Sequence, residues 1–449
     1  MVSCNEKKLE SELNEVYNEF FADGGESVSL FAEENGKFRY IAECGDLRRE
    51  YEYEAEYSGE LERKRLFKRY AKLSLYDFLS EKTNKKLPWG ALTGIRPTKL
   101  YYQNEQNADY FFSDLMRVSE KKYGIVKRIV QAQADFYKPD DDAADFFVGI
   151  PLCPTRCQYC SFISAEISKV SAVNEYIEAL CYEIEQSKKL CKTLRSVYIG
   201  GGTPVSLPIE LLKKVLDAIG CVDTEYTVEA GRPDCINEDV LKLLKDYNVT
   251  RVCVNPQTFK DETLRLIGRN HDSAQVLEKY ALAKSFGFDV NMDLIAGLPL
   301  ETFEDFRAGL QKAISLNPEN VTVHTLCLKK GSKLKELCSR LPEGEVEKMT
   351  DYAFDALTAA GYSPYYLYRQ KYMAGNLENV GYALKGKQCV YNIDVMEEIT
   401  QNVACGANAV SKRIFNNGER IERLGSPKDL KTYVAKIKDI TDKKRDLFS

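Results

Sequence analysis

Residues 145–162 read DFFVGIPLCPTRCQYCSF. The first six residues are mostly aromatic or β-branched, and they predict a buried strand. Three cysteines follow it directly, Cys153, Cys157 and Cys160, with the spacing C-x3-C-x2-C. Three thiols in one short polar loop after a buried strand indicate a candidate functional site in this loop.

Short β-branched or aromatic runs then alternate with longer amphipathic patterns. This alternation predicts α/β architecture with parallel strands, because each helix is long enough for a right-handed crossover. Chemistry in such sheets sits at the carboxyl ends of the strands. The six expected strands are 145–150, 196–200, 226–230, 250–255, 289–297 and 320–326. The helices expected between them are 173–190, 208–219, 238–246, 272–286 and 302–316.

The pattern divides the chain into three parts. Residues 1–140 lack the alternation and contain a hairpin-like stretch and a basic helix, so we expect a separate α+β module of unknown role. Residues 141–340 form the expected catalytic core. Residues 341–449 form a C-terminal region in which we expect a helix, a Tyr-rich strand over 362–368 and a polar, loop-rich tail.

Composition is that of a globular protein, with 449 residues, 44% hydrophobic and 29% charged. A net charge of -5 gives no overall electrostatic footprint for nucleic acid or an anionic membrane. The N-terminal residues resemble no signal peptide and no window approaches 18 apolar residues, so we expect a cytoplasmic protein without a membrane span. Its 14 cysteines are then core residues, metal ligands or reactive thiols and not disulfides.

The spacing of the three cysteines favours an iron–sulfur cluster. Three thiolates from one loop can bind three irons of a [4Fe-4S] cluster and leave the fourth iron open. A structural zinc site would need a fourth ligand, and no nearby Cys supplies it, while His271 and His324 are the only histidines. Three unrelated core cysteines would be unusual in a polar loop.

A second motif, GGGTP at residues 200–204, directly follows the second expected strand. Glycines at this place let backbone N–H and C=O groups approach a small ligand closely. Taken alone, a tight strand-to-helix turn explains the motif equally well.

Together, the cysteine spacing with an aromatic residue before the third Cys, and the GGGTP motif, resemble the radical S-adenosylmethionine (SAM) superfamily. Five further segments resemble its oxygen-independent coproporphyrinogen III oxidase family: EAGRPD (229–234), NPQTF (255–259), IGRNH (267–271), NMDLIAGLP (291–299) and GANAVS (406–411). PWGALTGIRPTK, HTLCLKKGS and YLYRQKYMAGNLENVGYA are similar to the HemZ-type branch. The resemblance covers essentially the whole chain and implies a partial TIM-type (β/α)6 barrel with an N-terminal α+β module and a C-terminal extension.

The resemblance also implies cofactors and site residues. The three cysteines would hold a [4Fe-4S] cluster. SAM carries an ammonium, a carboxylate and ribose hydroxyls, so its site needs acidic and basic groups from several strand ends, although each alone would more often form a surface salt bridge. The residues that the resemblance assigns to SAM are Gly201, Gly202 and Thr203 for the methionine moiety, Glu229, Gln257, Arg269 and Asp293 for its amino, carboxylate or ribose groups, and Phe147, Cys327 and Val410.

The family's reaction removes a hydrogen atom from a substrate propionate, releases carbon dioxide and leaves a vinyl group. Two such cycles convert coproporphyrinogen III to protoporphyrinogen IX. The implied partners are this tetrapyrrole substrate, an electron donor such as flavodoxin or ferredoxin, and an electron acceptor. We expect a monomer that binds no nucleic acid.

Three positions depart from the family's pattern. Phe162 stands where the best-studied members have a fourth cysteine, Gly149-Ile150-Pro151 replaces a His-Ile-Pro sequence, and Phe147 replaces a tyrosine. The family's heme-chaperone branch also has Phe at the fourth-cysteine position, but its HNxxYW motif reads GNLENV at 375–380 here. A heme chaperone, a radical SAM enzyme with another substrate and a plain electron carrier are the alternative interpretations.

A substrate with four propionates needs cationic partners. Surface solvation is the usual state of such side chains, and Arg369 is the best exception among them. His271 lies within the segment assigned to SAM, and His324 is expected to be a hydrogen-bonded core residue. The cationic candidates are Lys329, Lys330, Arg369 and Lys371.

Overall fold

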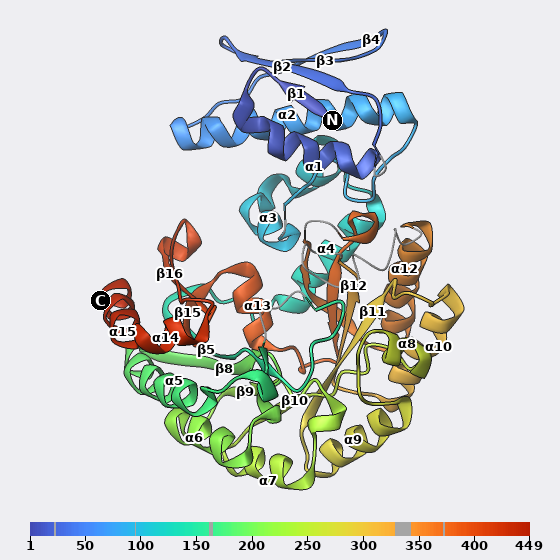
Figure 1. Cartoon of the computed structure of the whole chain (residues 1–449). Helices are drawn as coiled ribbons and strands as arrows, with labels where there is room; N and C mark the ends of the chain where they lie inside the picture. Colours follow the sequence, from blue (N-terminus) through green and yellow to red (C-terminus); the bar gives the residue numbers. More distant parts are fainter. Residues whose placement is uncertain (22–23, 95, 161–164, 328–342, 371–372) are drawn as a thin grey trace. The chain divides into compact units, whose positions relative to one another are not determined.

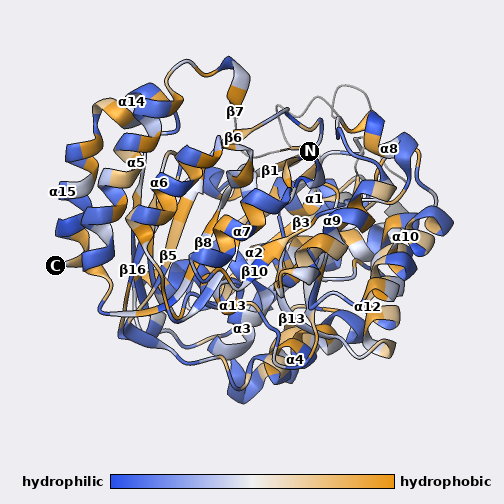
Figure 2. Cartoon of the chain, turned by 90° about the horizontal axis from the view of Figure 1, so that it is seen from below, coloured by the Kyte–Doolittle hydropathy of each residue, from blue (hydrophilic) through white to orange (hydrophobic). Residues whose placement is uncertain are grey.

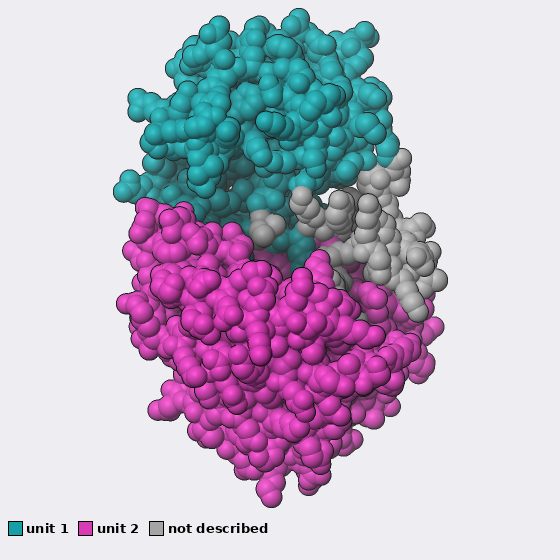
Figure 3. Space-filling model, turned by 60° about the vertical axis from the view of Figure 1, so that its left-hand side comes forward, with its two compact units in different colours: residues 1–127, 369–371, 375–377 teal, residues 128–368, 372–374, 378–449 magenta. Residues whose placement is uncertain are grey.

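The computed structural model describes residues 1–21, 24–94, 96–160, 165–327, 343–370 and 373–449 (Figure 1). Contacts divide the chain into two compact units (Figure 3). Unit 1 comprises residues 1–127, 369–371 and 375–377, and unit 2 comprises residues 128–368, 372–374 and 378–449. Among the described residues, no helix is long and apolar enough to cross a bilayer.

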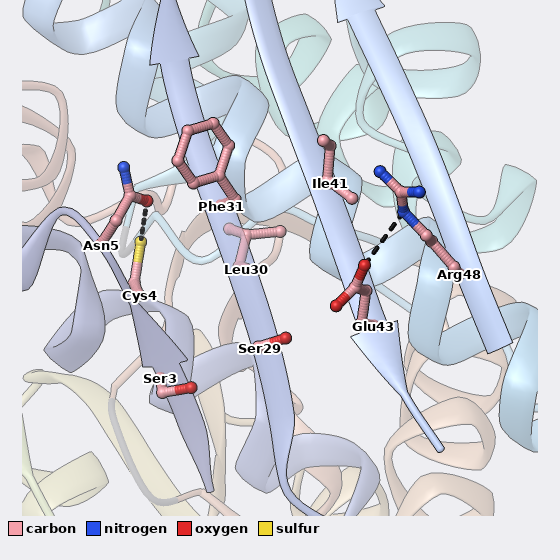
Figure 4. Close-up of a pocket in the computed structure, with 9 residues that line it drawn as sticks. All are labelled: Ser3, Cys4, Asn5, Ser29, Leu30, Phe31, Ile41, Glu43 and Arg48. Carbon is pink, nitrogen blue, oxygen red and sulfur yellow. Dashed lines mark hydrogen bonds and ion pairs between the residues drawn. The ribbon is translucent and has the colours of Figure 1, made fainter. Parts of the chain in front are cut away.

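Unit 1 contains a four-stranded sheet in the order β1-β2-β3-β4. Helix α2 packs on one face, where the Tyr40 hydroxyl donates a 2.7 Å hydrogen bond to the carbonyl of Phe67. The other face carries a shallow hollow lined by Phe31, Ile41 and the ion pair of Glu43 with Arg48 (Figure 4). The elements are β1 (Val2–Cys4), α1 (Glu10–Phe20), β2 (Val28–Glu34), β3 (Phe38–Cys44), β4 (Leu47–Tyr53), α2 (Glu60–Thr83), α3 (Pro97–Gln103) and α4 (Glu120–Gln133), within which the boundary to unit 2 falls.

Unit 2 is built on a sheet whose described strands run in the order β13-β14-β12-β11-β10-β9-β8-β5-β15-β16-β17. Six consecutive members, β5 to β12, are parallel neighbours. They confirm the six strands predicted from the alternating pattern. Their bounds are β5 (Asp140–Ile150), β8 (Thr193–Gly201), β9 (Glu225–Val228), β10 (Arg251–Cys253), β11 (Asp289–Ala296) and β12 (Asn320–Thr325).

Amphipathic helices connect these strands and lie on the outer side of the curved sheet (Figure 1). Val197 and Ile199 of β8 are fully buried on this side, and the apolar residues of the helices and strands face each other (Figure 2). The five predicted helices are confirmed, and two of them begin with capping boxes at Asp272 and Thr302. The helices are α5 (Val173–Ser187), α6 (Ile209–Ile219), α7 (Glu238–Asp246), α8 (Asp261–Leu266), α9 (Ser273–Ser285) and α10 (Phe303–Leu316).

The C-terminal region extends this same sheet at both ends, and the division of the chain at residues 140 and 340 stays a prediction. β14 pairs antiparallel with β12, and β15 pairs parallel with β5. A short pair, β6 (Leu152–Cys153) with β7 (Ala165–Glu166), stands apart from it. The C-terminal elements are α12 (Glu343–Ala359), β13 (Ser363–Tyr368), β14 (Asn379–Ala383), α13 (Val390–Glu397), β15 (Thr400–Cys405), β16 (Val410–Phe415), β17 (Arg420–Gly425), α14 (Leu430–Ala435) and α15 (Ile437–Phe448).

The expectation of a loop-rich tail is wrong because its polar residues are used inside the sheet. All six residues of β15 are buried. The Thr400 hydroxyl donates to Asp145 at 2.6 Å, and the Gln401 amide donates to the Ile414 carbonyl at 2.9 Å. Buried polar groups that are paired in this way cost little, but they erase the apolar pattern by which strands are predicted.

Helix α13 lies on the inner side of the curved sheet (Figure 1). It contacts β8, β13 and β15, which belong to different parts of the strand order. Its Tyr391 ring stacks on Tyr198 of β8 with centroids 4.4 Å apart. A helix from the C-terminal region therefore packs on the concave side of the sheet.

The C-terminal helices are tied to the sheet by a buried ion pair. Lys444 of α15 lies 2.6 Å from Glu183 of α5, and both side chains are at most 1% exposed. Lys444 also donates to the carbonyl of Ala404 at 2.8 Å, while Glu183 accepts the backbone N–H of Gly406 at 2.7 Å. The two buried charges are paired with each other, and both side chains also form hydrogen bonds with the backbone at the end of β15.

Candidate cofactor site at the carboxyl ends of the parallel strands

The three cysteines lie on the loop that follows β5, and all are partly exposed. Cys153 belongs to β6, and its sulfur lies 3.5 Å from the hydroxyl of Thr203. The backbone N–H of Cys160 donates to the carbonyl of Cys157 at 3.1 Å, which closes a turn between them. Within the described part of the chain, no three His, Cys, Asp or Glu side chains are grouped closely enough to hold one metal ion. Phe162 lies outside the described residues.

Arg232 holds this loop and was not singled out from the sequence. Its guanidinium forms a two-point ion pair with Asp234 at 2.8–2.9 Å and donates to the Thr155 hydroxyl at 2.9 Å. The same nitrogen that contacts Thr155 lies 3.8 Å from the sulfur of Cys157. Arg232 therefore ties the Asp234 segment to the cysteine loop through Thr155 and Cys157. Its place within EAGRPD is the signal that could have drawn attention to it.

The GGGTP segment packs directly against the cysteine loop. The backbone N–H of Thr203 donates to the Leu152 carbonyl at 2.8 Å. A Cβ atom at Gly202 would lie 2.5 Å from that carbonyl oxygen, and Gly201 has a φ of +97°. Both positions therefore require glycine, one for close backbone approach and the other for its conformation.

Glu229 follows β9 and faces the glycine segment. One carboxylate oxygen accepts the Tyr198 hydroxyl at 2.7 Å, and the other accepts the Gly201 N–H at 3.1 Å. Burial raises the pKa of Glu229 to about 7, and Asp293 adds to the increase while the two donors oppose it.

Asp293 on β11 and Gln257 after β10 lie side by side through their backbones, with the Gln257 N–H donating to the Asp293 carbonyl at 2.9 Å. The Asp293 carboxylate accepts the side-chain amides of Asn255 at 2.7 Å and Asn291 at 2.8 Å. Burial alone would raise the pKa of Asp293, but His324, 3.6 Å away, and the amide donors lower it. Asp293 is therefore a carboxylate at neutral pH.

Arg269 is buried and lies between the cysteine loop and the strand ends. Its guanidinium donates to the Gly231 carbonyl at 2.8 Å and to the Tyr159 hydroxyl at 2.9 Å. Tyr159 is the aromatic residue before the third cysteine, so Arg269 links the IGRNH segment to the cluster motif.

The remaining predicted residues lie in different places. Phe147 of β5 stacks on Tyr198 and on Tyr391, with centroids 6.3 and 6.1 Å apart. Cys327 follows β12 and pairs through its backbone with Met373. Val410 opens β16 and is 42% exposed, and β16 is joined to β5 of the parallel sheet through β15.

Of the four cationic candidates, the structure describes Arg369. Arg369 belongs to unit 1, where it is 3% exposed, donates to the Asn376 carbonyl at 3.1 Å and lies over the Trp89 ring. Lys329, Lys330 and Lys371 lie outside the described residues. His324 differs from the expected core residue, because its side chain is 27% exposed and faces Asp293.

Comparison with known proteins identifies a family model and several relatives. A family model described as the radical SAM superfamily matches residues 147–313. The chain is 37% identical over 420 residues to the oxygen-independent coproporphyrinogen-III oxidase-like protein HemZ of Bacillus subtilis (strain 168), covering 86% of this chain and 83% of that protein. It is 34% identical over 235 residues to the heme chaperone HemW of the same organism, covering 49% of this chain and 61% of that protein.

Among solved structures, coproporphyrinogen III oxidase (HemN) from Escherichia coli, described as a radical SAM enzyme, matches with a TM-score of 0.55 at 21% identity. The match covers 72% of this chain and 74% of that chain. At this identity the similarity shows the fold, which is of the mixed α/β, TIM-type radical SAM kind.

The residues at the strand ends fit SAM. A carboxylate, a buried guanidinium and the glycine backbone offer the acceptors and donors that an ammonium, a carboxylate and ribose hydroxyls need. The side-chain oxygen of Gln257 is buried without a hydrogen-bond partner among the described residues. Buried acceptors are usually paired, so this oxygen fits a position that a bound ligand would contact. The chain belongs to the HemZ- and HemN-type family of radical SAM enzymes, whose cofactors are a [4Fe-4S] cluster and SAM.

Proposed function

We propose that this protein is a radical SAM oxidoreductase that converts propionates of coproporphyrinogen III to vinyl groups and so produces protoporphyrinogen IX. The identity to HemZ over most of both chains is the observation that carries the proposal. Each conversion removes carbon dioxide, one proton and two electrons from a propionate. An electron acceptor is therefore required besides SAM.

In this proposal, Cys153, Cys157 and Cys160 hold the cluster, and Arg232 positions the loop that carries Cys157. When bound, the two cofactors supply a one-electron cleavage that starts hydrogen-atom abstraction from the substrate. Gly201, Gly202 and Thr203 contact the methionine moiety of SAM.

Four further residues bind the polar groups of SAM in this proposal. Arg269 binds a carboxylate, while Glu229, Gln257 and Asp293 accept hydrogen bonds from amino or ribose groups. Phe147, Cys327 and Val410 complete the contacts. The acceptors converge from successive strand ends, and their geometry supports SAM binding more directly than it supports any one substrate.

The first test is an anaerobic assay of the whole chain with a reconstituted cluster, SAM, reductant and coproporphyrinogen III. We expect 5'-deoxyadenosine and vinyl-bearing tetrapyrroles to accumulate together, and a Cys157→Ser variant to produce neither. If 5'-deoxyadenosine forms without vinyl products, the coproporphyrinogen assignment is wrong and another substrate must be sought.

The match to HemW favours a second candidate, a heme chaperone. Neutral imidazole is the usual axial ligand of heme iron, and His324 is the more exposed of the two histidines, while His271 is 4% exposed. Titration with hemin separates the candidates. A chaperone would bind hemin tightly and lose this binding in His324→Ala. The oxidoreductase would instead convert coproporphyrinogen III in the assay above.

Three accompanying features belong to the same proposal. The electron donor would be a small redox protein such as flavodoxin or ferredoxin, the chain would act as a monomer, and its location would be cytoplasmic. Size-exclusion chromatography of the reconstituted protein tests the oligomeric state.

A further inference from the structure

Three aromatic rings stack on the inner side of the sheet in unit 2. Tyr198 of β8, Phe147 of β5 and Tyr391 of α13 contact one another as a triangle of rings, with centroids 4.4 to 6.3 Å apart and ring planes 16–22° from parallel. The neighbours of Tyr198 along the strand, Val197 and Ile199, point to the outer helices, so Tyr198 points inward. The two rings packed against it restrict rotation of the Tyr198 side chain.

The hydroxyl of Tyr198 reaches the carboxylate of Glu229. Its 2.7 Å hydrogen bond and the 3.1 Å bond from the Gly201 N–H occupy one lone pair on each carboxylate oxygen. Position 200 requires glycine, because a Cβ atom there would lie 2.7 Å from the Glu229 carboxyl carbon and would displace the carboxylate. The plane of the carboxylate is thereby fixed, and the remaining lone pairs keep a constant direction.

We propose that Tyr198, held by Phe147 and by Tyr391 of α13, is a positioning residue that orients the Glu229 carboxylate to accept hydrogen bonds from SAM. The inference rests on the proposed role of Glu229. It gives α13, which the sequence analysis did not predict, a function in cofactor binding. None of these three aromatic residues belongs to the cysteine motif or to the GGGTP motif.

Titratable groups from five elements face Glu229: Tyr198 from β8, Cys253 from β10, Asp293 from β11, His324 from β12 and Tyr391 from α13. Burial raises the pKa of Glu229 to about 7, and the Tyr198 hydroxyl opposes the increase. Loss of this hydroxyl therefore raises the pKa further. Since the carboxylate is the accepting form, SAM affinity should fall as pH decreases through this pKa, and the fall should move to higher pH without the hydroxyl.

The experiment measures the dissociation constant of SAM by anaerobic equilibrium dialysis with the reconstituted whole chain between pH 6 and 9. Tyr198→Phe should weaken SAM binding about tenfold at pH 7, which is the cost of one hydrogen bond to a charged group. The difference from the parent protein should shrink toward pH 9. Iron content and cluster absorbance equal to the parent identify folded variants.

Tyr226→Phe is the matched control. Tyr226 lies on the neighbouring strand β9 and is fully buried, and its hydroxyl has no partner among the described residues. This variant should keep the parent's affinity and pH profile. Tyr391→Leu tests the stack by a second route and should weaken SAM binding, while Tyr391→Phe, which keeps the ring, should restore most of it.

The Glu229→Gln variant tests the proposed role of Glu229 separately from the positioning role of Tyr198. If this variant weakens SAM binding but Tyr198→Phe behaves like Tyr226→Phe, the positioning role of Tyr198 is overturned and the role of Glu229 stands. If Glu229→Gln also retains the parent's affinity, both are overturned.

Discussion

At the scale of single residues, the backbone approaches the cysteine loop closely at Gly202. A Cβ atom there would lie 2.5 Å from the Leu152 oxygen and 2.8 Å from the Ile150 oxygen. Gly202→Ala should therefore displace the cysteine loop and weaken SAM binding by at least about tenfold, at a cost in stability of about 1–3 kcal/mol. Equilibrium dialysis and urea denaturation measure the two effects.

Gly425→Ala serves as the control, because a Cβ atom at this position of β17 has nothing within 4 Å. It should leave both SAM affinity and stability unchanged. Equal affinities of Gly202→Ala and the parent protein would contradict the close packing of the two loops.

Glu301, which follows β11, is a carboxyl group with a raised pKa. Burial raises its pKa to about 7, and the Thr258 hydroxyl, which donates to it, opposes the increase. The folded pKa lies above the unfolded one, so this group's contribution to stability is present at pH 4 and is lost as pH rises toward 7. Glu301→Gln should thus be more stable than the parent at pH 8, by about 1–3 kcal/mol, and no more stable at pH 4.

Thermal denaturation at both pH values checks this prediction. A stabilisation of Glu301→Gln that is the same at pH 4 and pH 8 would show that the side chain's shape, and not its ionisation, decides the effect.

Motifs in the sequence single out the candidate site residues but not the side chains that contact them. Cys153, Gly202 and Glu229 stand in short motifs whose spacing is read along the chain. Arg232 and Tyr198 act through contacts with residues 75 and 31 positions away, and no local pattern reports such contacts. Tyr198 also stands in a strand whose other residues are apolar, where a tyrosine is usual.

At the scale of elements, the buried pair of Lys444 and Glu183 holds α15 against α5. Removal of one partner leaves an unpaired charge in the interior. Lys444→Met should therefore lower the free energy of unfolding by about 3–5 kcal/mol. Lys443→Met, which removes an exposed neighbour 2.9 Å from Asp439, should change it by less than about 1 kcal/mol.

Urea denaturation of the two variants gives the comparison. The double variant Glu183→Leu with Lys444→Met should recover much of the loss, since both charges are then absent. A double variant less stable than Lys444→Met alone would mean that Glu183 stabilises the fold mainly through Gly406.

The regular alternation made six strands and five helices predictable, because each strand and crossover helix buries a continuous apolar face. The elements after residue 378 could not be predicted in this way. β15 is rich in polar residues that find partners only in the assembled sheet, and Tyr391 packs on strands almost two hundred residues earlier in the chain.

At the scale of the whole molecule, unit 1 and unit 2 have separate cores. Phe38 is 2% exposed in the core of unit 1, and Phe38→Ala should destabilise that unit by about 3–5 kcal/mol. The residues that we propose for SAM binding belong to unit 2, so SAM affinity should stay within about twofold of the parent at a temperature where both units are folded.

Differential scanning calorimetry with SAM binding tests this separation. Phe31→Ala is the control, since Phe31 is 44% exposed on the opposite face of the same sheet and its loss should cost no more than about 0.5 kcal/mol. A large loss of SAM affinity in Phe38→Ala would show that the two units act together.

The pairing of β5 with β15 has a consequence for synthesis on the ribosome. Thr400 and Asp145, which are hydrogen-bonded across this pair, lie 255 residues apart. At about 5–20 residues per second, one edge of β5 waits on the order of 10–50 seconds for its partner. During this time the nascent chain already carries the cysteine loop beside an open strand edge, which is a template for aggregation. Chaperones that shield this edge on nascent chains should therefore raise the yield of folded protein.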